Sequence, residues 1–235
     1  MGVKRRIVPV ILWDEHGSVK GQRFDKSRRI GSMEDRLRLI ERRDVDELII
    51  LDVSRLAPRF EAVSELCSNM FCPVTIGGGV KNVADIRRML ACGADKVSIN
   101  SSALQQPSFI SDAAERFGAQ AVVVSIDVMG GMVGAKLPAD WAAEVERLGA
   151  GEILLTSVDR DGTMLGYDLD LIRDVSSAVS IPVIAAGGCG SYEHMVDALK
   201  AGAHAVASGA MFQFADATPK GAARYLAEHG IATRI

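Results

Sequence analysis

The stretch Pro182-Val-Ile-Ala-Ala-Gly-Gly-Cys-Gly-Ser191 decides the fold that this sequence predicts. An apolar strand ends in a glycine-rich turn, a helical segment follows, and a second strand ends in Ser208-Gly209. Glycine lets the backbone bend sharply, and a phosphate can approach its N–H group because no Cβ intervenes. A helix that begins directly after such a turn also presents unpaired N–H groups to the anion. One unit of this kind by itself predicts only a turn.

The same layout occurs earlier in the chain, in Pro73-Val-Thr-Ile-Gly-Gly-Gly79 and in Gly93-Ala-Asp-Lys-Val-Ser-Ile-Asn-Ser101. Pro73, Gly78, Gly79 and Gly93 each have a counterpart 109 positions later, at Pro182, Gly187, Gly188 and Gly202. Glu47–Val53 pairs with Glu152–Val158 at an offset of 105. The sequence therefore predicts two similar halves, about 1–115 and 116–235, each with a glycine turn suited to a phosphate. This arrangement suggests a substrate with two phosphates.

Composition narrows the class of protein. A chain of 235 residues commonly forms one α/β barrel domain, and 48% hydrophobic residues with 5% aromatic residues suit Val/Ile/Leu strands covered by helices. A net charge of −3 gives no electrostatic case for binding nucleic acid. The four cysteines form no C-x-x-C pair and the four histidines are scattered, so we expect no metal or cofactor. No run has the length of a membrane span or signal-peptide core, which predicts a cytoplasmic protein.

Strand-like and helix-like segments alternate along the chain, which predicts a parallel sheet. Eight such units in two similar halves favour a single closed (β/α)8 TIM barrel over an open sheet. The expected strands are centred on 7–12, 48–53, 74–76, 96–100, 121–126, 152–156, 183–186 and 205–208. The expected helices begin at Ser32 and lie near 58–70, 83–92, 107–117, 138–148, 168–179, 192–201 and 219–229.

A long polar segment, Trp13 to Gly31, is predicted to be a loop after the first strand. Structureless segments of this length are usually functional or mobile. Its charge fits two interpretations equally, a flap that covers a phosphate or a solvated basic loop. The cations concerned are Lys20, Arg23, Lys26, Arg28 and Arg29.

A barrel of this type places its active site at the carboxyl ends of its strands. Asp127 is the sharpest candidate there, because it ends the apolar strand Val122–Ile126, where a carboxylate needs a reason. A catalytic role and a role in capping or loop bonding are equally favoured by that position. No Rossmann fingerprint, P-loop or Ser-His-Asp set is present.

These strand ends resemble those of the cyclase subunit family of imidazole glycerol phosphate synthase. The resemblance extends over essentially the whole chain and is carried by 46–52, 77–79, 93–100, 121–127 and Gly149–Asp168. It implies a (β/α)8 barrel that takes ammonia from a separate glutaminase subunit in a heterodimer. The ammonia is added to a bisphosphorylated ribulosyl substrate, which is then cyclised and cleaved.

The resemblance also implies roles for individual residues. Asp127 matches a catalytic aspartate, Lys20 matches a mobile-loop lysine that grips substrate, and Asp161 is a further catalytic candidate. One phosphate is expected against Gly78, Gly79, Asn100 and Ser101, and the other against Gly162, Thr163, Gly187, Gly188, Ser208 and Gly209. A charged ring that admits ammonia corresponds to Arg6, Glu47, Lys96 and Glu152, with Asp95 facing the glutaminase.

Two departures from the family pattern stand out. Leu12 occupies the place of the family's other catalytic aspartate, and the segment Val128–Leu137 is shorter than the family's hairpin insertion. Both are shared with a branch that resembles the cyclase but delivers ammonia for amidino-sugar formation in surface-polysaccharide biosynthesis.

Three functions therefore remain open. The first is an ammonia-accepting synthase subunit, of the cyclase or the amidotransfer kind. The second is the related isomerase of histidine biosynthesis, which has no reason to keep the charged ring. The third is a non-catalytic scaffold that activates a glutaminase and channels its ammonia, which Leu12 favours. The charged ring has an alternative reading as stabilising salt bridges at the bottom of the barrel.

Overall fold

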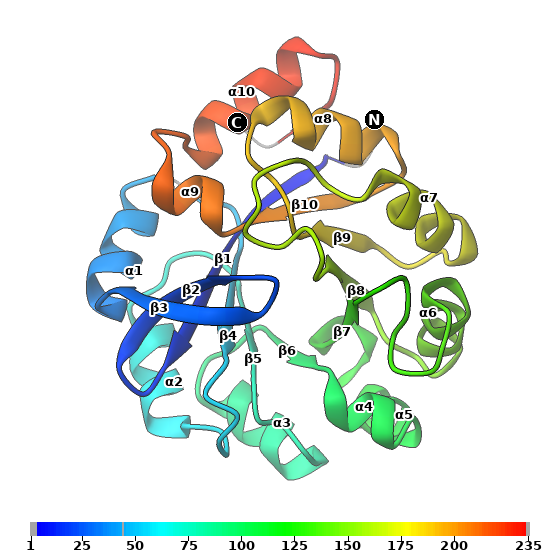
Figure 1. Cartoon of the computed structure of the whole chain (residues 1–235). Coiled ribbons are helices and arrows are strands. Elements are labelled where there is room, and N and C mark those ends of the chain that lie inside the picture. The colour runs from blue at the N-terminus through cyan, green and yellow to red at the C-terminus, as the bar shows by residue number, and fades with distance from the viewer. Residues whose placement is uncertain (1–3, 44, 234–235) are drawn as a thin grey trace.

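The computed structural model describes residues 4–43 and 45–233. Within these residues the strands form one ten-stranded sheet, in which β1 (Arg6–Asp14) pairs in parallel with both β4 and β10 and so closes a barrel. Figure 1 shows the helices around the outside of this barrel. The predicted α/β TIM barrel is therefore confirmed. Its other strands are β4 (Leu48–Asp52), β5 (Val74–Gly77), β6 (Lys96–Ile99), β7 (Val122–Val128), β8 (Glu152–Ser157), β9 (Val183–Ala186) and β10 (Ala205–Ser208).

Each expected helix lies in its predicted region, with ends that differ by a few residues. Ser32 caps the first one as expected, since its side chain accepts a hydrogen bond from the Asp35 N–H at 3.1 Å. The long helices are α1 (Met33–Glu41), α2 (Phe60–Ser68), α3 (Val83–Ala91), α5 (Ser108–Phe117), α6 (Pro138–Arg147), α7 (Leu169–Ala178), α8 (Tyr192–Lys200) and α10 (Pro219–Glu228). Short helices that the sequence did not predict are α4 (Ser101–Gln105), α9 (Ala210–Phe214) and the 3₁₀ turn η1 (Ala119–Ala121).

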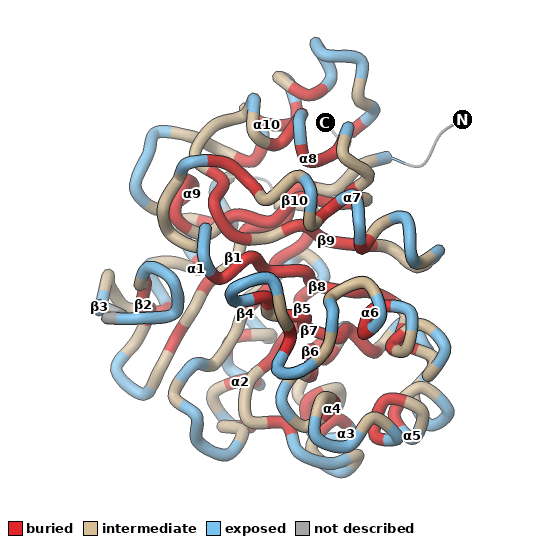
Figure 2. Tube along the Cα trace, turned by 45° about the vertical axis from the view of Figure 1, so that its right-hand side comes forward, coloured by how far each residue is buried: buried red, intermediate tan, exposed pale blue. Residues whose placement is uncertain are grey.

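The hydrophobic residues form two layers. Side chains alternate between the faces of a strand, so Val8 and Val10 of β1 point into the barrel while Ile7 and Ile11 pack against the helices. Figure 2 shows buried residues along the strands and exposed residues on the outer helix faces and loops. The inner layer consists of Val8, Ile49, Val123, Leu154, Ile184, Ala205 and Ala207, with Val10, Leu51 and Ala186 against it. Of the described helices, none combines the length and the apolar character needed to cross a bilayer.

The predicted loop over Trp13–Gly31 is wrong. The chain forms an antiparallel hairpin there, with β2 (Gly17–Gln22) paired to both β1 and β3 (Asp25–Gly31). The turn between them is made by Arg23 and Phe24, both with positive φ, of 52° and 59°. Two-residue hairpin turns of this kind usually carry Asn or Gly, so Arg23-Phe24 is not recognisable as a turn from the residue types. The hairpin lies across one end of the barrel in Figure 1.

Candidate functional site

Asp127 lies near the end of β7 and shares the inward-pointing face of that strand with Val123. Asn100 donates a hydrogen bond from Nδ2 to Asp127 Oδ2 at 2.6 Å, and the Thr156 side chain also hydrogen-bonds to this carboxylate. Burial raises the pKa of Asp127 to about 6, against the two hydrogen bonds that lower it and with the charge of Asp161 that raises it. A carboxyl group with a pKa in this range can both give and take a proton near neutral pH.

Lys20 reaches the same end of the barrel from the hairpin. Its side chain is almost wholly buried, and Nζ lies 3.0 Å and 3.3 Å from the carboxylate oxygens of Asp161. The hairpin also contacts the β8–α7 loop through Gln22 Nε2, which donates to the Gly162 carbonyl at 3.2 Å, and through the Arg23 N–H, which donates to the Asp161 carbonyl at 3.0 Å. The structure therefore brings Lys20 and Asp161 together beside Asp127.

Position 12 of β1 carries no carboxylate, although the strand itself ends at Asp14. Leu12 has the inward parity of Val8 and Val10, so an apolar side chain occupies that position. Two acids near this strand end, one on β1 and one on the neighbouring β4, have other partners. Asp14 Oδ1 accepts a hydrogen bond from the His16 N–H at 2.8 Å, and Asp52 is paired with Arg59 at 2.9 Å.

Arg59 is a residue that sequence reasoning missed. From the start of α2 its guanidinium lies 3.8 Å from the centre of the Trp13 ring and donates to the Asp14 carbonyl at 3.0 Å. It thereby ties the end of β1 to Asp52 at the end of β4. No signal in the sequence indicates this contact, because an arginine at a helix start normally faces solvent.

The two predicted glycine turns have matching geometry. Gly79 and Gly188 have φ values of 68° and 98°, and a Cβ on them would lie 2.2 Å from the Leu56 carbonyl oxygen and 2.1 Å from the Gly166 carbonyl oxygen. Gly78 and Gly187 are equally enclosed by backbone. Each turn therefore needs glycine to pack against the preceding loop, whether or not a phosphate binds there.

The other expected phosphate-binding residues lie at the same end of the barrel. Asn100 is engaged with Asp127, Ser101 begins α4, and the Thr163 hydroxyl donates to the Arg160 carbonyl at 2.7 Å. Ser208 ends β10, and Gly209 follows it. A groove of about 1030 Å³ lies between the hairpin, the β8–α7 loop and α9, a size that suits a small-molecule ligand. It is lined by Lys20, Gly21, Gln22, Arg23, Asp25, Arg28, Gly162, Thr163, Met164, Leu165, Ala210 and Phe214.

At the opposite end of the barrel, four side chains form a closed ring of ion pairs. Glu47 binds Arg6 through one carboxylate oxygen at 2.7 Å and Lys96 through the other at 2.9 Å. Glu152 likewise binds Arg6 and also Lys96, the latter at 2.9 Å. Burial disfavours the charges of Arg6, Glu47 and Lys96, but the opposite charges around them outweigh it. They lower the pKa of Glu47 and raise the pKa of Lys96.

The surface beside this ring carries Asp95 and Phe71. Asp95 Oδ2 accepts a hydrogen bond from the Val74 N–H at 2.8 Å, so this carboxylate orders the start of β5. Phe71, three residues before Val74, is 89% exposed. Sequence reasoning missed Phe71, since its exposure depends on where α2 ends. Among the described residues, no three His, Cys, Asp or Glu side chains are arranged to hold a metal ion.

Comparisons with known proteins identify a family whose model covers most of the chain. The family described as Histidine biosynthesis protein matches residues 6–218, a range that includes each candidate residue from Arg6 to Gly209. The imidazole glycerol phosphate synthase subunit HisF of Clostridium botulinum (strain Okra / Type B1) is 40% identical over 252 aligned residues. That alignment covers 99% of this chain and 100% of the relative.

Proposed function

This chain belongs to the histidine biosynthesis protein family, and from that premise we propose that it is an ammonia-accepting synthase subunit of the cyclase type. The expected resemblance is confirmed at the level of the family. The proposal is carried by the presence of two features in one barrel. A closed ring of four charged side chains lies at the amino end, and the titratable Asp127 lies with Lys20 at the carboxyl end. The isomerase alternative offers no role for the ring.

Ammonia, in this proposal, enters through the ring and travels inside the barrel. The ring leaves no carboxylate oxygen without a cation, so one ion pair must open before a molecule can pass. Above it the inner layer is mostly apolar, from Val8 to Ala207, and the buried hydroxyls of Thr75, Ser98 and Ser125 lie on the same face. Such an interior admits a neutral molecule and disfavours an ammonium ion. A separate glutaminase subunit, docked around Arg6, Glu47, Lys96, Glu152, Asp95 and Phe71, would supply the ammonia.

At the carboxyl end, Asp127 would act as general acid or base on the acceptor. Lys20 would leave Asp161 to pair with an anionic group of the substrate, and the two glycine turns would hold its phosphates. Release of Lys20 frees the Asp161 carboxylate near Asp127, which makes Asp161 the candidate for a second proton-transfer group. We also propose a cytoplasmic location, consistent with four cysteines that form no disulfide in the described residues.

Leu12 favours a second candidate function, delivery of ammonia without the full cyclase reaction. Ring closure and cleavage move protons at two places on the substrate, and one of the expected carboxylates is missing while Asp14 and Asp52 are otherwise bonded. The alternatives are an amidotransfer subunit of amidino-sugar biosynthesis and a non-catalytic scaffold that activates a glutaminase. In either case the ring and the barrel interior keep their role.

The deciding experiment combines the purified chain with the glutaminase subunit of an imidazole glycerol phosphate synthase. Glutamine hydrolysis and imidazole glycerol phosphate formation are measured separately, with glutamine and with free ammonia. Stimulated hydrolysis with little product supports the delivery function, whereas stimulated hydrolysis with product supports the cyclase function. A chain that neither binds nor stimulates a glutaminase contradicts both.

A further inference from the structure

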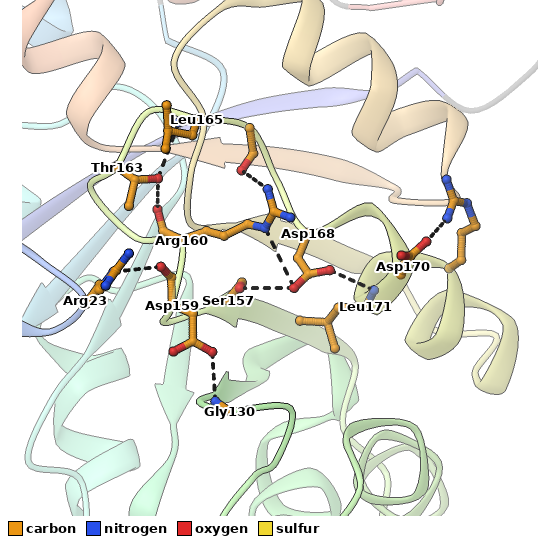
Figure 3. Close-up of polar contacts among 12 residues, drawn as sticks. Arg23, Gly130, Ser157, Asp159, Arg160, Thr163, Leu165, Asp168, Asp170 and Leu171 are labelled. Atoms are coloured by element: carbon orange, nitrogen blue, oxygen red, sulfur yellow. Dashed lines mark hydrogen bonds and ion pairs between the residues drawn. The ribbon is translucent and has the colours of Figure 1, made fainter.

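The β8–α7 loop contacts both the hairpin and the turn after β7, through residues that lie close together in the chain. Asp159 Oδ2 accepts a hydrogen bond from the Gly130 N–H at 2.8 Å, and its carbonyl accepts one from Arg23 Nε at 3.0 Å. Figure 3 shows Asp159 between these two partners. Asp161, two residues on, binds Lys20 at 3.0 Å. A continuous path of contacts thus runs from the hairpin turn through Asp159 to Gly130.

Gly130 lies three residues after Asp127. It belongs to a tight turn in which Met129 and Met132 exchange backbone hydrogen bonds at 3.0 Å and 3.1 Å. The regular pairing of β7 with β8 ends just before it, at Val128 and Ser157. The Asp159 carboxylate therefore continues the link between the two strands beyond the last paired residues, and a bond from N–H to a carboxylate is stronger than one to a neutral acceptor.

On this geometry we propose that Asp159 is a positioning residue that couples the hairpin to Asp127. When the hairpin lies over the barrel, Arg23 fixes the backbone of the β8–α7 loop at two carbonyls, those of Asp159 and Asp161. The Asp159 carboxylate is then held where it binds the Gly130 N–H, which fixes the turn directly after Asp127. The position of Lys20 and the position of Asp127 are then coupled.

The inference rests on the proposed role of Asp127, but its test needs neither turnover nor a glutaminase. Hydrogen exchange of the Gly130 amide is measured in the full chain, together with the pKa of Asp127 by NMR of its carboxyl carbon. Arg23→Ala is the decisive variant, because Arg23 does not touch Gly130. Loss of a single exposed hydrogen bond corresponds to roughly a two- to tenfold change in a local equilibrium.

We expect Arg23→Ala and Asp159→Ala each to speed exchange at Gly130 by about two- to tenfold, and to shift the Asp127 pKa. Asp159→Asn keeps an acceptor oxygen and should retain most of the protection. Asp170→Ala serves as the matched control, since this exposed carboxylate pairs with Arg173. Unchanged exchange and unchanged pKa in Arg23→Ala would overturn the coupling and leave Asp159 as a local cap, whatever the outcome of the activity assays.

Discussion

The two ends of the barrel treat charge in opposite ways. At the amino end, four charges alternate in a ring, and each carboxylate oxygen meets a cation. At the carboxyl end, the hydrogen-bond partners of Asp127 among the described residues are the neutral side chains of Asn100 and Thr156, while the nearby Asp161 is paired with Lys20. The ring moves pKa values away from neutrality, down for Glu47 and up for Lys96, whereas burial brings the pKa of Asp127 to about 6.

This difference assigns passage of a small molecule to the amino end and proton transfer to the carboxyl end. The pKa values of Arg6, Glu47 and Lys96 are moved away from neutrality, so a passage through the ring has to open by movement of side chains. Asp127 can change its charge near neutral pH, so proton transfer belongs at that end. Leu12 affects only proton transfer, because it lies at the carboxyl end of β1.

The largest expected effect follows from restoring a second carboxylate. General acid–base help is worth about 10²–10⁴-fold in rate, so Leu12→Asp should raise the rate of imidazole glycerol phosphate formation from free ammonia by about that factor. Adding Asp127→Asn to this variant should remove the gain. Substrate binding, measured by calorimetry, should persist in both. Rapid turnover by the unaltered chain would show that Asp161 or Asp14 already supplies the missing group.

The next effect concerns stability. Because the pKa of Asp127 is raised from 3.8 to about 6, the folded state binds this proton more tightly than the unfolded state, and ionisation costs stability as pH rises through this window. Asp127→Asn removes that cost, so it should stabilise the chain at pH 8 by roughly 2–3 kcal/mol, at about 1.4 kcal/mol per pKa unit.

The gain should shrink below pH 6 and vanish near pH 4. Urea unfolding at several pH values measures it, with the exposed Asp170→Asn as control. A gain in unfolding free energy that is independent of pH would mean that burial does not disfavour the charged form of Asp127. The contrast between the two ends of the barrel would then be wrong.

A smaller effect is expected from opening the ring. Lys96→Ala removes one cation from both glutamates and leaves the rest of the barrel interior unchanged. Product formation driven by glutamine should fall about tenfold, the equivalent of roughly 1.4 kcal/mol, while formation driven by free ammonia stays within about twofold. Lys81→Ala, an exposed lysine at the other end of the barrel, is the control. Equal losses with both nitrogen sources would contradict the gate.

The barrel was predictable because its signals are local. Strand, glycine turn and helix recur in order, and the enclosed glycines such as Gly79 and Gly188 mark the turns. The β2–β3 hairpin was not, because Arg23 and Phe24 adopt positive φ without the residues that usually announce it.

The division into two half-barrels stays a prediction, and one observation agrees with it. His204 lies 109 positions after Asp95. It accepts a hydrogen bond from the Val183 N–H at 3.3 Å, at the start of the preceding strand, as Asp95 does from the Val74 N–H.

Contacts between strand ends were harder to foresee. The sequence places Asn100 and Asp127 at neighbouring ends but does not say that the amide binds the carboxylate, and Asn100 was assigned to a phosphate instead. Arg59 and Asp159 reach their partners across elements, which no spacing in the sequence reveals. The ring is a favourable case, since its members begin or precede four strands and share the inward face. Its role as a gate stays a prediction.

The smallest expected effect tests the surface beside the ring. A large apolar side chain that is 89% exposed, as Phe71 is, gains most by being covered, and aromatic side chains are enriched among the residues that dominate binding at protein interfaces. Phe71→Ser should weaken binding of a glutaminase subunit about three- to tenfold and leave ammonia-driven activity unchanged. Leu165→Ser is a matched control, because Leu165 is 78% exposed at the opposite end of the barrel. Calorimetric titration of each variant with the glutaminase gives both affinities. If Leu165→Ser weakened binding while Phe71→Ser did not, the glutaminase would dock on the catalytic end, and the ring could not be its entrance for ammonia.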